Sequence, residues 1–370
     1  MLQSAHFREI PRPLLERATT GNITPADGVY LFTECEPLEL FALADRLRRI
    51  TSGERVTYVL NRNINFTNRC IGSCRFCAFR DDDGYLFSID EIMEKVREAV
   101  RIGVSEICIQ GGLLEGARLE DYCRILHSIK SEFPHLHLHA YSPMEVLHMA
   151  ANSGVTIKRA LLRLQECGLG SMPGTAAEIL SERVREEICP EKLSAREWIE
   201  VVETAHMAGI PTTATMMYGH VETVEERIEH LILIRELQRR TGGFTEFVPL
   251  PFLPRNNELG ERLLRERGFE RVNGTDDLKV HAIARIILHT HINNIQASWV
   301  KLGVKLAQIA LHCGASDLGG TLMEERISKS AGATSGEYLA PSKLNTIIRE
   351  AGREPAIRDT LYRRITPQFE

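Results

Sequence analysis

Hydrophobic and polar positions follow two rhythms along most of this chain. Short apolar runs that end at Gly, Pro or polar residues alternate with longer segments in which apolar positions recur every three or four residues. The first pattern is typical of buried strands, and the second is typical of helices with one buried face. We therefore predict eight strand–helix units, with strands at residues 56–66, 106–110, 135–140, 168–172, 211–218, 244–250, 293–298 and 317–320.

Eight such units predict a closed barrel of parallel strands surrounded by helices. The expected fold class is α/β, a (β/α)8 barrel of the TIM type with helical caps at both ends of the chain. We expect residues 1–50 to form the N-terminal helical cap, residues 51–335 the barrel, and residues 336–370 a helical tail packed on the barrel. The pattern gives no sign of a second domain or of a sequence repeat.

Local signals mark some of the boundaries between these elements. A Ser followed three residues later by Glu, as in Ser88 with Glu91 and Ser194 with Glu197, is a capping box that predicts the start of a helix. A segment rich in Pro, Asn and Gly at 249–274 predicts a linker before the last helices of the barrel.

Composition and charge exclude some classes of function. Of the 370 residues, 43% are hydrophobic and 26% are charged, which is ordinary for a globular enzyme. The formal net charge of -5 is small for this length, so we expect no general surface for nucleic acid or membranes. No apolar run reaches the roughly 18 residues that span a bilayer.

The number and placement of the cysteines indicate a reducing compartment. There are nine cysteines, an odd number, and no secretory signal is visible in the sequence. We therefore expect a cytoplasmic protein. Six of the cysteines are scattered through apolar segments and are interpreted as small buried hydrophobic residues: Cys35, Cys108, Cys123, Cys167, Cys189 and Cys313.

The remaining three cysteines, Cys70, Cys74 and Cys77, lie within eight residues of one another, directly after the first predicted strand. Cuboidal iron–sulfur clusters are usually held by four thiolates, so three thiols with no fourth nearby would leave one iron open for chemistry. The alternatives are a zinc knuckle and a redox pair formed by Cys74 and Cys77. Zinc would need a second pair of ligands, which does not follow at a suitable distance, and a redox pair would not explain Cys70.

This spacing, with Phe76 just before the last cysteine, resembles the signature of the radical S-adenosylmethionine (SAM) enzymes. The resemblance implies a 4Fe-4S cluster whose open iron is chelated by SAM, and reductive cleavage of SAM to a 5′-deoxyadenosyl radical. It also implies that Phe76 lies near the adenine of SAM, although packing of the loop on the barrel is a compatible alternative. An electron donor is implied as a partner.

The active site of such a barrel lies at the carboxyl ends of its strands, and the residues expected there form a consistent set. Asn61, Asn63 and Asn65 share one face of the first strand by its two-residue period, next to the cysteine loop. The resemblance implies that the glycines after the second strand contact the methionine end of SAM. Asn63 and Asn65 either line the site or support the cysteine loop.

We assign the other candidates by their place at these strand ends. The expected cofactor-binding residues are Phe76, Gly111, Gly112, Ser142, Glu178 and Arg185, of which Arg185 has a helix-surface ion pair as its alternative. The expected substrate-binding residues are Asn63, Asn65, His139, Thr215, His220, Gln296, Trp299 and Glu324. His220 has a purely structural role as its alternative, and no catalytic residue is assigned.

Most of the chain after residue 50 is similar to one subgroup of radical SAM enzymes. This subgroup contains the tyrosine-using subunit of FO synthase and two enzymes of a menaquinone pathway, aminofutalosine synthase and dehypoxanthine futalosine cyclase. The similarity rests on residues 61–66, 70–79, 109–112, 139–145, 168–180, 213–223, 244–250 and 295–303. Residues 172–178, 188–190 and 317–321 most resemble the FO synthase subunit.

The resemblance implies cleavage of the Cα–Cβ bond of L-tyrosine and addition of its 4-hydroxybenzyl group to 5-amino-6-(D-ribitylamino)uracil. This step belongs to the formation of FO, the chromophore of coenzyme F420. Because the chain has one cysteine triad and one barrel, the cyclising radical SAM enzyme is expected to be a separate polypeptide. The alternatives are a menaquinone-pathway enzyme acting on a futalosine-type substrate and, from a different class, a structural zinc or RNA-binding protein.

Overall fold

The strand predicted at 56–66 forms, but it is interrupted at Leu60. In the computed structural model, which describes residues 9–268 and 273–368, this segment makes β1 (Arg55–Val59) and β2 (Asn61–Asn65). β1 pairs with strands from the C-terminal third of the chain, whereas β2 pairs in parallel with β3 (Glu106–Gln110). The interruption therefore lets one continuous segment pair with β3 on one side and with the C-terminal strands on the other, which closes the ring.

The remaining strands complete this ring in chain order. They are β4 (His137–Ala140), β5 (Thr212–Tyr218), β6 (Phe244–Pro251) and β7 (Asp317–Gly320). β3 pairs with β4, β5 with β6, and β7 with β1, all in parallel. Single bridges at Ser171 and Met172 join β4 to β5, and bridges at Ile295 and Gln296 join β6 to β7. The predicted barrel is therefore confirmed, and the predicted strands at 168–172 and 293–298 are reduced to isolated bridges.

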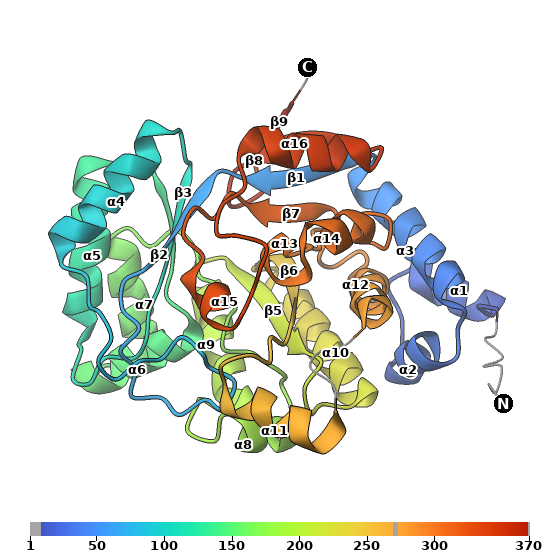
Figure 1. The fold of residues 1–370 in the computed structure, drawn as a ribbon, viewed down its shortest axis with the longest axis horizontal. Helices are drawn as coiled ribbons and strands as arrows, with labels where there is room; N and C mark the ends of the chain where they lie inside the picture. The colour runs from blue at the N-terminus through green and yellow to red at the C-terminus, as the bar shows by residue number, and fades with distance from the viewer. Residues whose placement is uncertain (1–8, 269–272, 369–370) are drawn as a thin grey trace.

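Most helices cover the outside of the ring, whereas the short helix at residues 326–330 lies at the cavity (Figure 1). Those that follow the strands are α4 (Ile89–Arg101), α5 (Leu119–Glu132), α6 (Pro143–Ser153), α7 (Ile157–Glu166), α8 (Glu182–Ile188), α9 (Ala195–Met207), α10 (Val224–Thr241), α11 (Glu258–Arg267), α12 (Gly274–Leu288), α13 (Trp299–Leu302), α14 (Val304–Ala310) and α15 (Arg326–Ser330). The capping boxes predicted at Ser88 and Ser194 begin α4 and α9 as expected. The predicted linker contains α11, and its residues 269–272 lie outside the described part of the chain.

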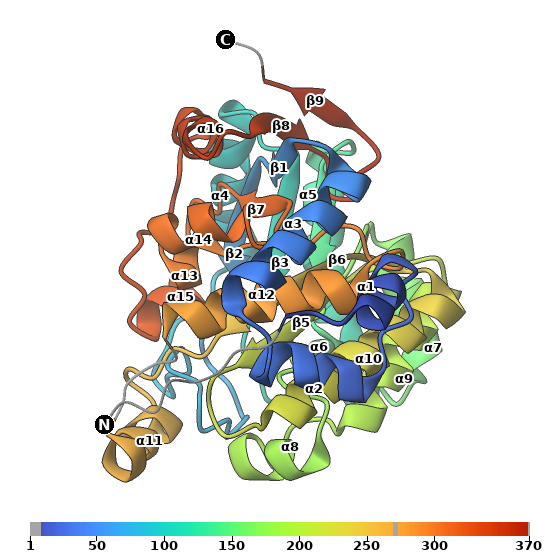
Figure 2. The same cartoon turned by 90° about the vertical axis from the view of Figure 1, so that its right-hand side faces the viewer.

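The N-terminal segment packs as helices against one side of the barrel. It comprises α1 (Arg12–Thr19), α2 (Pro25–Thr33) and α3 (Pro37–Ser52), and α3 runs alongside α12 (Figure 2). Buried apolar residues of these helices, such as Leu31 and Leu40, belong to the same core cluster as the buried face of α12. Residues 1–8 of the expected cap lie outside the described part of the chain.

The C-terminal segment differs from the predicted helical tail. It contains α16 (Pro341–Glu350), but β8 (Glu354–Arg358) then pairs in parallel with β1, and β9 (Ile365–Pro367) pairs antiparallel with β8. β8 forms at this place because β1 pairs with β7 along one edge only. The other edge of β1 is not covered by β3, since β3 pairs with β2. β8 satisfies the backbone groups along that edge.

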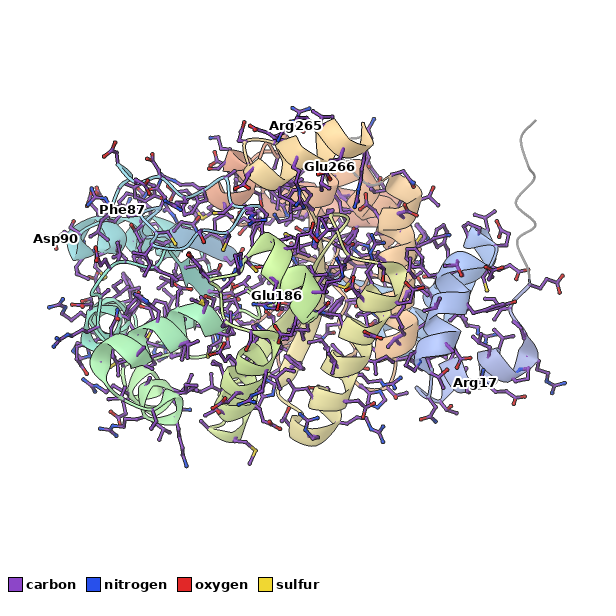
Figure 3. All side chains as sticks on the ribbon, turned by 90° about the horizontal axis from the view of Figure 1, so that it is seen from below. Arg17, Phe87, Asp90, Glu186, Arg265 and Glu266 are labelled. Atoms are coloured by element: carbon purple, nitrogen blue, oxygen red, sulfur yellow. The ribbon has the colours of Figure 1, made fainter. Side chains whose placement is uncertain are left out.

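Apolar packing lies between the strands and the helices, while charged side chains such as Glu186 and Arg265 project outward (Figure 3). The inside of the ring is unusual for this fold. Branched apolar residues commonly fill such barrels, whereas here the inward positions of β2 are Asn61, Asn63 and Asn65. Among the described residues, no helix is long and apolar enough to cross a membrane.

Candidate active site

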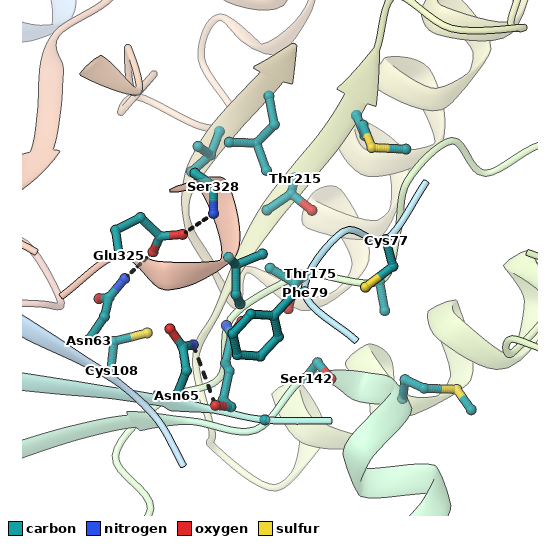
Figure 4. Close-up of a pocket in the computed structure, with 18 of the residues that line it drawn as sticks. Asn63, Asn65, Cys77, Phe79, Cys108, Ser142, Thr175, Thr215, Glu325 and Ser328 are labelled. Carbon is teal, nitrogen blue, oxygen red and sulfur yellow. Dashed lines mark hydrogen bonds between the residues drawn. The ribbon is translucent and has the colours of Figure 1, made fainter. Parts of the chain in front are cut away.

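A cavity of about 590 Å³ occupies the inside of the barrel and opens at the cysteine loop. Alternate residues of β2, β3, β5 and β6 line it, as the two-residue period of a strand requires. These inward residues are Asn61, Asn63 and Asn65 of β2, Glu106, Cys108 and Gln110 of β3, Thr213, Thr215 and Met217 of β5, and Glu246, Val248 and Leu250 of β6. The face predicted for the three asparagines is therefore the inner one. Figure 4 shows Asn63, Asn65 and Cys108 with the cysteine loop.

Cys70, Cys74 and Cys77 all line this cavity, and their thiols are free. The Sγ atom of Cys70 accepts hydrogen bonds from the backbone N–H groups of Gly72 and Leu113, each at 3.3 Å. N–H donors directed at sulfur stabilise thiolate ligands and tune the cluster that they hold. The chemistry of this loop therefore fits an iron–sulfur cluster.

No three His, Cys, Asp or Glu side chains within residues 9–268 and 273–368 gather closely enough to bind a single metal ion. A polynuclear cluster makes a different demand, because each thiolate binds a different iron and the ligands do not have to converge on one point.

The glycines after β3 are required by the close approach of the cysteine loop. A Cβ atom on Gly112 would lie 2.1 Å from the carbonyl oxygen of Arg69 and 2.8 Å from Cβ of Cys70. A Cβ atom on Gly111 would lie 2.6 Å from the ring of Phe66. Both glycines line the cavity as predicted, but packing of the loop against the strand already explains why both are glycine.

Ser142 and Glu145 tie the start of α6 to this glycine pair. Glu145 accepts hydrogen bonds from the N–H of Gly111 at 3.1 Å and from the N–H and hydroxyl of Ser142, both at 2.7 Å. Burial raises the pKa of Glu145 to about 7, even though these donors favour its charged form. Ser142 lines the cavity as expected, with its hydroxyl also serving as the cap of α6.

Glu178 lines the cavity next to a lysine that the sequence pattern did not single out. Lys192 Nζ lies 2.6 Å from Oε1 of Glu178 and 5.2 Å from the centre of the Phe76 ring. Burial disfavours the charge of Glu178, but Lys192 outweighs it and holds the pKa of that carboxyl below its usual value. Lys192 follows α8 in a loop with no recognisable motif, so only the fold brings it to Phe76.

Asn63 and Asn65 lie deeper in the cavity and are at least nine-tenths buried. Asn63 donates from Nδ2 to Oε2 of Glu325 at 2.5 Å, and Asn65 donates from Nδ2 to the carbonyl oxygen of Gln110 at 3.5 Å. The Oδ1 atom of each has no hydrogen-bond partner within the described chain. Neither side chain donates to the cysteine loop, and each keeps one unpaired, covered acceptor beside the cavity.

Three further predicted substrate residues also line the cavity: His139, Thr215 and Gln296. His139 Nδ1 lies 2.7 Å from the hydroxyl oxygen of Ser171, and burial lowers its pKa to about 4, so the imidazole is neutral near pH 7. The Thr215 hydroxyl donates to the carbonyl oxygen of Gly174 at 2.8 Å. The side chains of His139 and Thr215 are therefore held in place by other residues of the barrel.

Arg185 and His220, in contrast, lie outside the cavity wall. The Arg185 guanidinium is buried and donates to the carbonyl oxygens of Ala177 and Leu193, the former at 2.6 Å. The imidazole of His220 lies 3.0 Å from the carbonyl oxygen of Met217. The helix α8 directs the Arg185 side chain toward the loop that carries Glu178. The N–H groups of its guanidinium already donate to backbone carbonyl oxygens there.

Trp299 and Glu324 are likewise outside the cavity wall. The indole N–H of Trp299 donates to the carbonyl oxygen of Gly320 at 3.0 Å, in a fully buried position. Glu324 forms ion pairs with Arg62 at 3.0 Å and Lys95 at 3.0 Å. The neighbouring Glu325, which was not predicted, is the one that faces the cavity.

Comparisons with known proteins agree with this geometry. Residues 64–234 match the radical SAM superfamily, and residues 241–368 match the family described as the CofH/MqnC C-terminal region. Among solved structures, methylornithine synthase (PylB) has a TM-score of 0.73 at 17% identity, covering 93% of this chain and 97% of its own. The hydrogenase maturase HydG from Carboxydothermus hydrogenoformans has a TM-score of 0.71 at 16% identity, covering 95% of this chain and 80% of its own.

Curated relatives are much more similar in sequence. The 5-amino-6-(D-ribitylamino)uracil–L-tyrosine 4-hydroxyphenyl transferase 1 of Methanosarcina barkeri is 61% identical over 354 residues, covering 96% of this chain and 94% of the relative. The transferase of the same name from Methanococcoides burtonii is 57% identical, covering 96% of this chain and 99% of the relative. That from Archaeoglobus fulgidus is 58% identical, covering 88% and 93%.

Proposed function

We propose that this chain is an enzyme with the same activity as its relatives. It belongs to the family of the 5-amino-6-(D-ribitylamino)uracil–L-tyrosine 4-hydroxyphenyl transferases within the radical SAM superfamily. Its substrates are then L-tyrosine and 5-amino-6-(D-ribitylamino)uracil. The Cα–Cβ bond of tyrosine breaks, and the 4-hydroxybenzyl group is added to the uracil. Identity of 57–61% over nearly the whole chain carries this proposal.

A radical SAM enzyme uses a 4Fe-4S cluster and SAM, which together supply the 5′-deoxyadenosyl radical. We propose that Cys70, Cys74 and Cys77 hold the cluster, because all three line the cavity and Cys70 already receives two N–H donors. SAM is then bound by residues of the same end of the barrel: Phe76, Gly111, Gly112, Ser142 and Glu178.

The chain's own residues must position both substrates and keep water away from the radical. We propose that Asn63, Asn65, His139, Thr215 and Gln296 bind substrate, since each lines the cavity below the cysteine loop. Exclusion of water from such a site prevents side reactions of a radical. The N-terminal helices and the C-terminal segment, which pack around the barrel, serve as caps in this proposal.

The proposal extends to the partners of the enzyme. The product is an adduct that still needs ring closure, and we assign that reaction to a second, separate radical SAM enzyme. A reducing partner supplies the electron that starts each turnover. Nine cysteines without a disulfide among the described residues fit a reducing cytoplasm.

An isotope experiment tests this function directly. The reconstituted enzyme is incubated without oxygen with SAM, a reductant, the diaminouracil and tyrosine labelled either on the ring and β-carbon or on the α-carbon and amine. The first label must appear in the uracil adduct, and the second must leave in a two-carbon fragment, with 5′-deoxyadenosine formed alongside. Formation of deoxyadenosine only with a futalosine-type substrate, or retention of the α-carbon in the adduct, would refute the assignment.

A further inference from the structure

The lower end of the cavity, opposite the cysteine loop, has a charged floor. Glu106 is the first residue of β3 and Glu246 lies near the start of β6, so both sit toward the amino ends of the strands. Arg358, the last residue of β8, reaches into the barrel from the C-terminal segment and donates to Asp317 at 2.6 Å and to Glu246 at 3.3 Å. Glu106, Glu246, Arg358 and Thr360 line the cavity.

Negative charge exceeds positive charge at this floor. The guanidinium of Arg358 forms ion pairs with Glu246 and Asp317, whereas Glu106 accepts a hydrogen bond from Nδ2 of Asn61 at 3.2 Å. The nearby His139 is neutral because burial lowers its pKa to about 4. Burial raises the pKa of Glu246 to about 7. For Glu106, burial disfavours the charge, but the positive charge of Arg358 favours it, and the pKa of Glu106 stays below its usual value. Glu106 is therefore ionised near neutral pH.

Hydrogen-bond acceptors are also in surplus above the floor. Oδ1 of Asn63 and Oδ1 of Asn65 are buried and have no partner within the described chain, and both residues line the cavity. Glu325 adds a carboxylate at the same level, whose Oε2 accepts from Asn63 and whose Oε1 accepts from the N–H of Ser328 at 2.9 Å (Figure 4). Buried acceptors without partners are costly, so rotation of these covered amide groups toward a ligand that brings donors would be favourable.

A strained turn places Glu325 in this wall. Leu322 and Met323 have φ angles of 60° and 58°, the left-handed region that non-glycine residues rarely occupy. The chain between β7 and α15 first runs along β2, where Leu322 accepts from the N–H of Asn63 at 2.8 Å, and then turns inward. Strain of this kind is found where function requires a particular placement.

We propose that the lower part of the cavity, from Asn63 and Glu325 down to Glu106 and Glu246, binds the diaminouracil with its ribityl chain on the floor, and that this floor rejects the same molecule when its chain end is phosphorylated. The inference rests on the proposed function. The uncharged diaminouracil is rich in donors, since its ring N–H groups, amino groups and hydroxyls all donate. A terminal phosphate would bring negative charge against the ionised carboxylate of Glu106 in a buried site.

This assignment places a constraint on the reaction that precedes this one. If the chain end must be a free hydroxyl, any phosphorylated form of the diaminouracil has to be hydrolysed by a phosphatase before it becomes a substrate. In this assignment, tyrosine and SAM occupy the upper part of the cavity, nearer the cysteine loop.

A comparison of two substrates tests the floor. The kcat/KM of the reconstituted enzyme is measured for the diaminouracil and for its ribityl 5-phosphate ester, at saturating SAM and tyrosine. The ester should be used at least about 100-fold less efficiently because of like-charge repulsion. Glu106→Gln, which keeps the shape but removes the charge, should narrow this ratio about tenfold. Glu246→Gln is the second variant if the first does not fold.

The outcomes separate the possible failures. Equal use of the two substrates by the wild-type enzyme would overturn the inference, and so would a large ratio that neither variant changes, because the discrimination would then come from size alone. If the wild-type enzyme makes no adduct from the diaminouracil and tyrosine, the proposed function itself is wrong, whatever the floor binds.

The role of Glu325 in the cavity wall can be tested with the neighbouring Glu324 as a matched control. Glu325→Gln should raise the KM for the diaminouracil about tenfold, with the KM for tyrosine unchanged, because a charged acceptor is lost. Glu324→Gln makes the same substitution at the preceding residue, which lies outside the cavity wall, and should leave both KM values unchanged. An equal effect of the two variants on the KM for the diaminouracil would contradict the assignment of Glu325.

Discussion

Lys192 Nζ lies 2.6 Å from Oε1 of Glu178 in the wall of the cavity, and the same ammonium group lies over the ring of Phe76. Glu178 comes from the chain between the barrel's middle strands, and Phe76 comes from the cysteine loop. The ammonium group of Lys192 therefore links the loop that carries the thiols to the segment that carries Glu178.

Replacing Lys192 should damage both stability and SAM binding. Lys192→Met leaves the carboxylate of Glu178 partly buried and unpaired, which costs about 3 kcal/mol in comparable buried pairs. We expect a lower denaturation midpoint and weaker SAM binding, measured by anaerobic equilibrium dialysis. Lys329→Met breaks an exposed pair with Glu337 and should cost less than about 1 kcal/mol. Equal stability losses in the two variants would show that the Lys192 pair has no special role.

Each cysteine of the loop should be essential for the cluster. Cys70→Ala, Cys74→Ala and Cys77→Ala should each abolish SAM cleavage while leaving a folded barrel, because an iron loses its thiolate. The wild-type chain should bind about four irons and four sulfides after anaerobic reconstitution. Cys123→Ala and Cys313→Ala, which change buried thiols in the packing, should retain iron and lose stability only. Zinc without sulfide in the wild-type chain would instead favour a structural metal site.

Trp299 should behave as a structural residue. Trp299→Phe removes the indole N–H that donates to the carbonyl oxygen of Gly320, leaving that acceptor buried and unpaired. The expected cost is about 1–3 kcal/mol in the free energy of unfolding, with no change in the KM for either substrate. The measurements are a denaturation curve and steady-state kinetics. A higher KM at unchanged stability would restore the role that we expected for Trp299 from the sequence.

Several buried histidines should make the fold sensitive to acid. Burial lowers the pKa of His206 and of His281 to about 4 and that of His230 to about 3. Between the usual pKa of about 6.5 and these values the unfolded chain binds protons that the folded chain does not. Stability should therefore be fully present above about pH 6.5 and fall as the pH drops toward 4, by up to about 1.4 kcal/mol per pH unit for each histidine.

A variant can isolate one of these contributions. His206 contacts the hydroxyls of Thr241 and Thr212 at 2.7 and 2.9 Å, and His206→Gln removes the titrating group while keeping polar atoms there. The slope of unfolding free energy against pH, taken from urea denaturation between pH 5 and 6.5, should become shallower. Changing the exposed His127 to Gln is the control. An unchanged slope in the His206 variant would contradict the expected proton uptake.

Features with a local cause could be predicted from the sequence. The capping boxes at Ser88 and Ser194 begin helices because the side chain and the amides it caps lie within one turn. The inward face of Asn63 and Asn65 follows from the two-residue period of a strand. The spacing of the three cysteines likewise placed them together on one loop beside the cavity.

Features that depend on contacts between distant residues could not be predicted in this way. The strand β8 forms because β1 has a free edge, which only the closed ring creates, so the predicted helical tail was wrong beyond α16. Lys192 lies directly over the ring of Phe76, at a separation in sequence that no spacing rule covers.

The sequence by itself determined a barrel, a cysteine loop and a polar inner face, because each depends on short-range periodicity or on spacing within one segment. Only the tertiary structure decided which neighbouring side chain faces inward. The left-handed turn at Leu322 and Met323 directs Glu325 rather than Glu324 into the cavity. The start of α13 at Trp299 likewise turns this side chain away from the cavity, because its direction follows the helical period rather than the alternation expected for the predicted strand at 293–298.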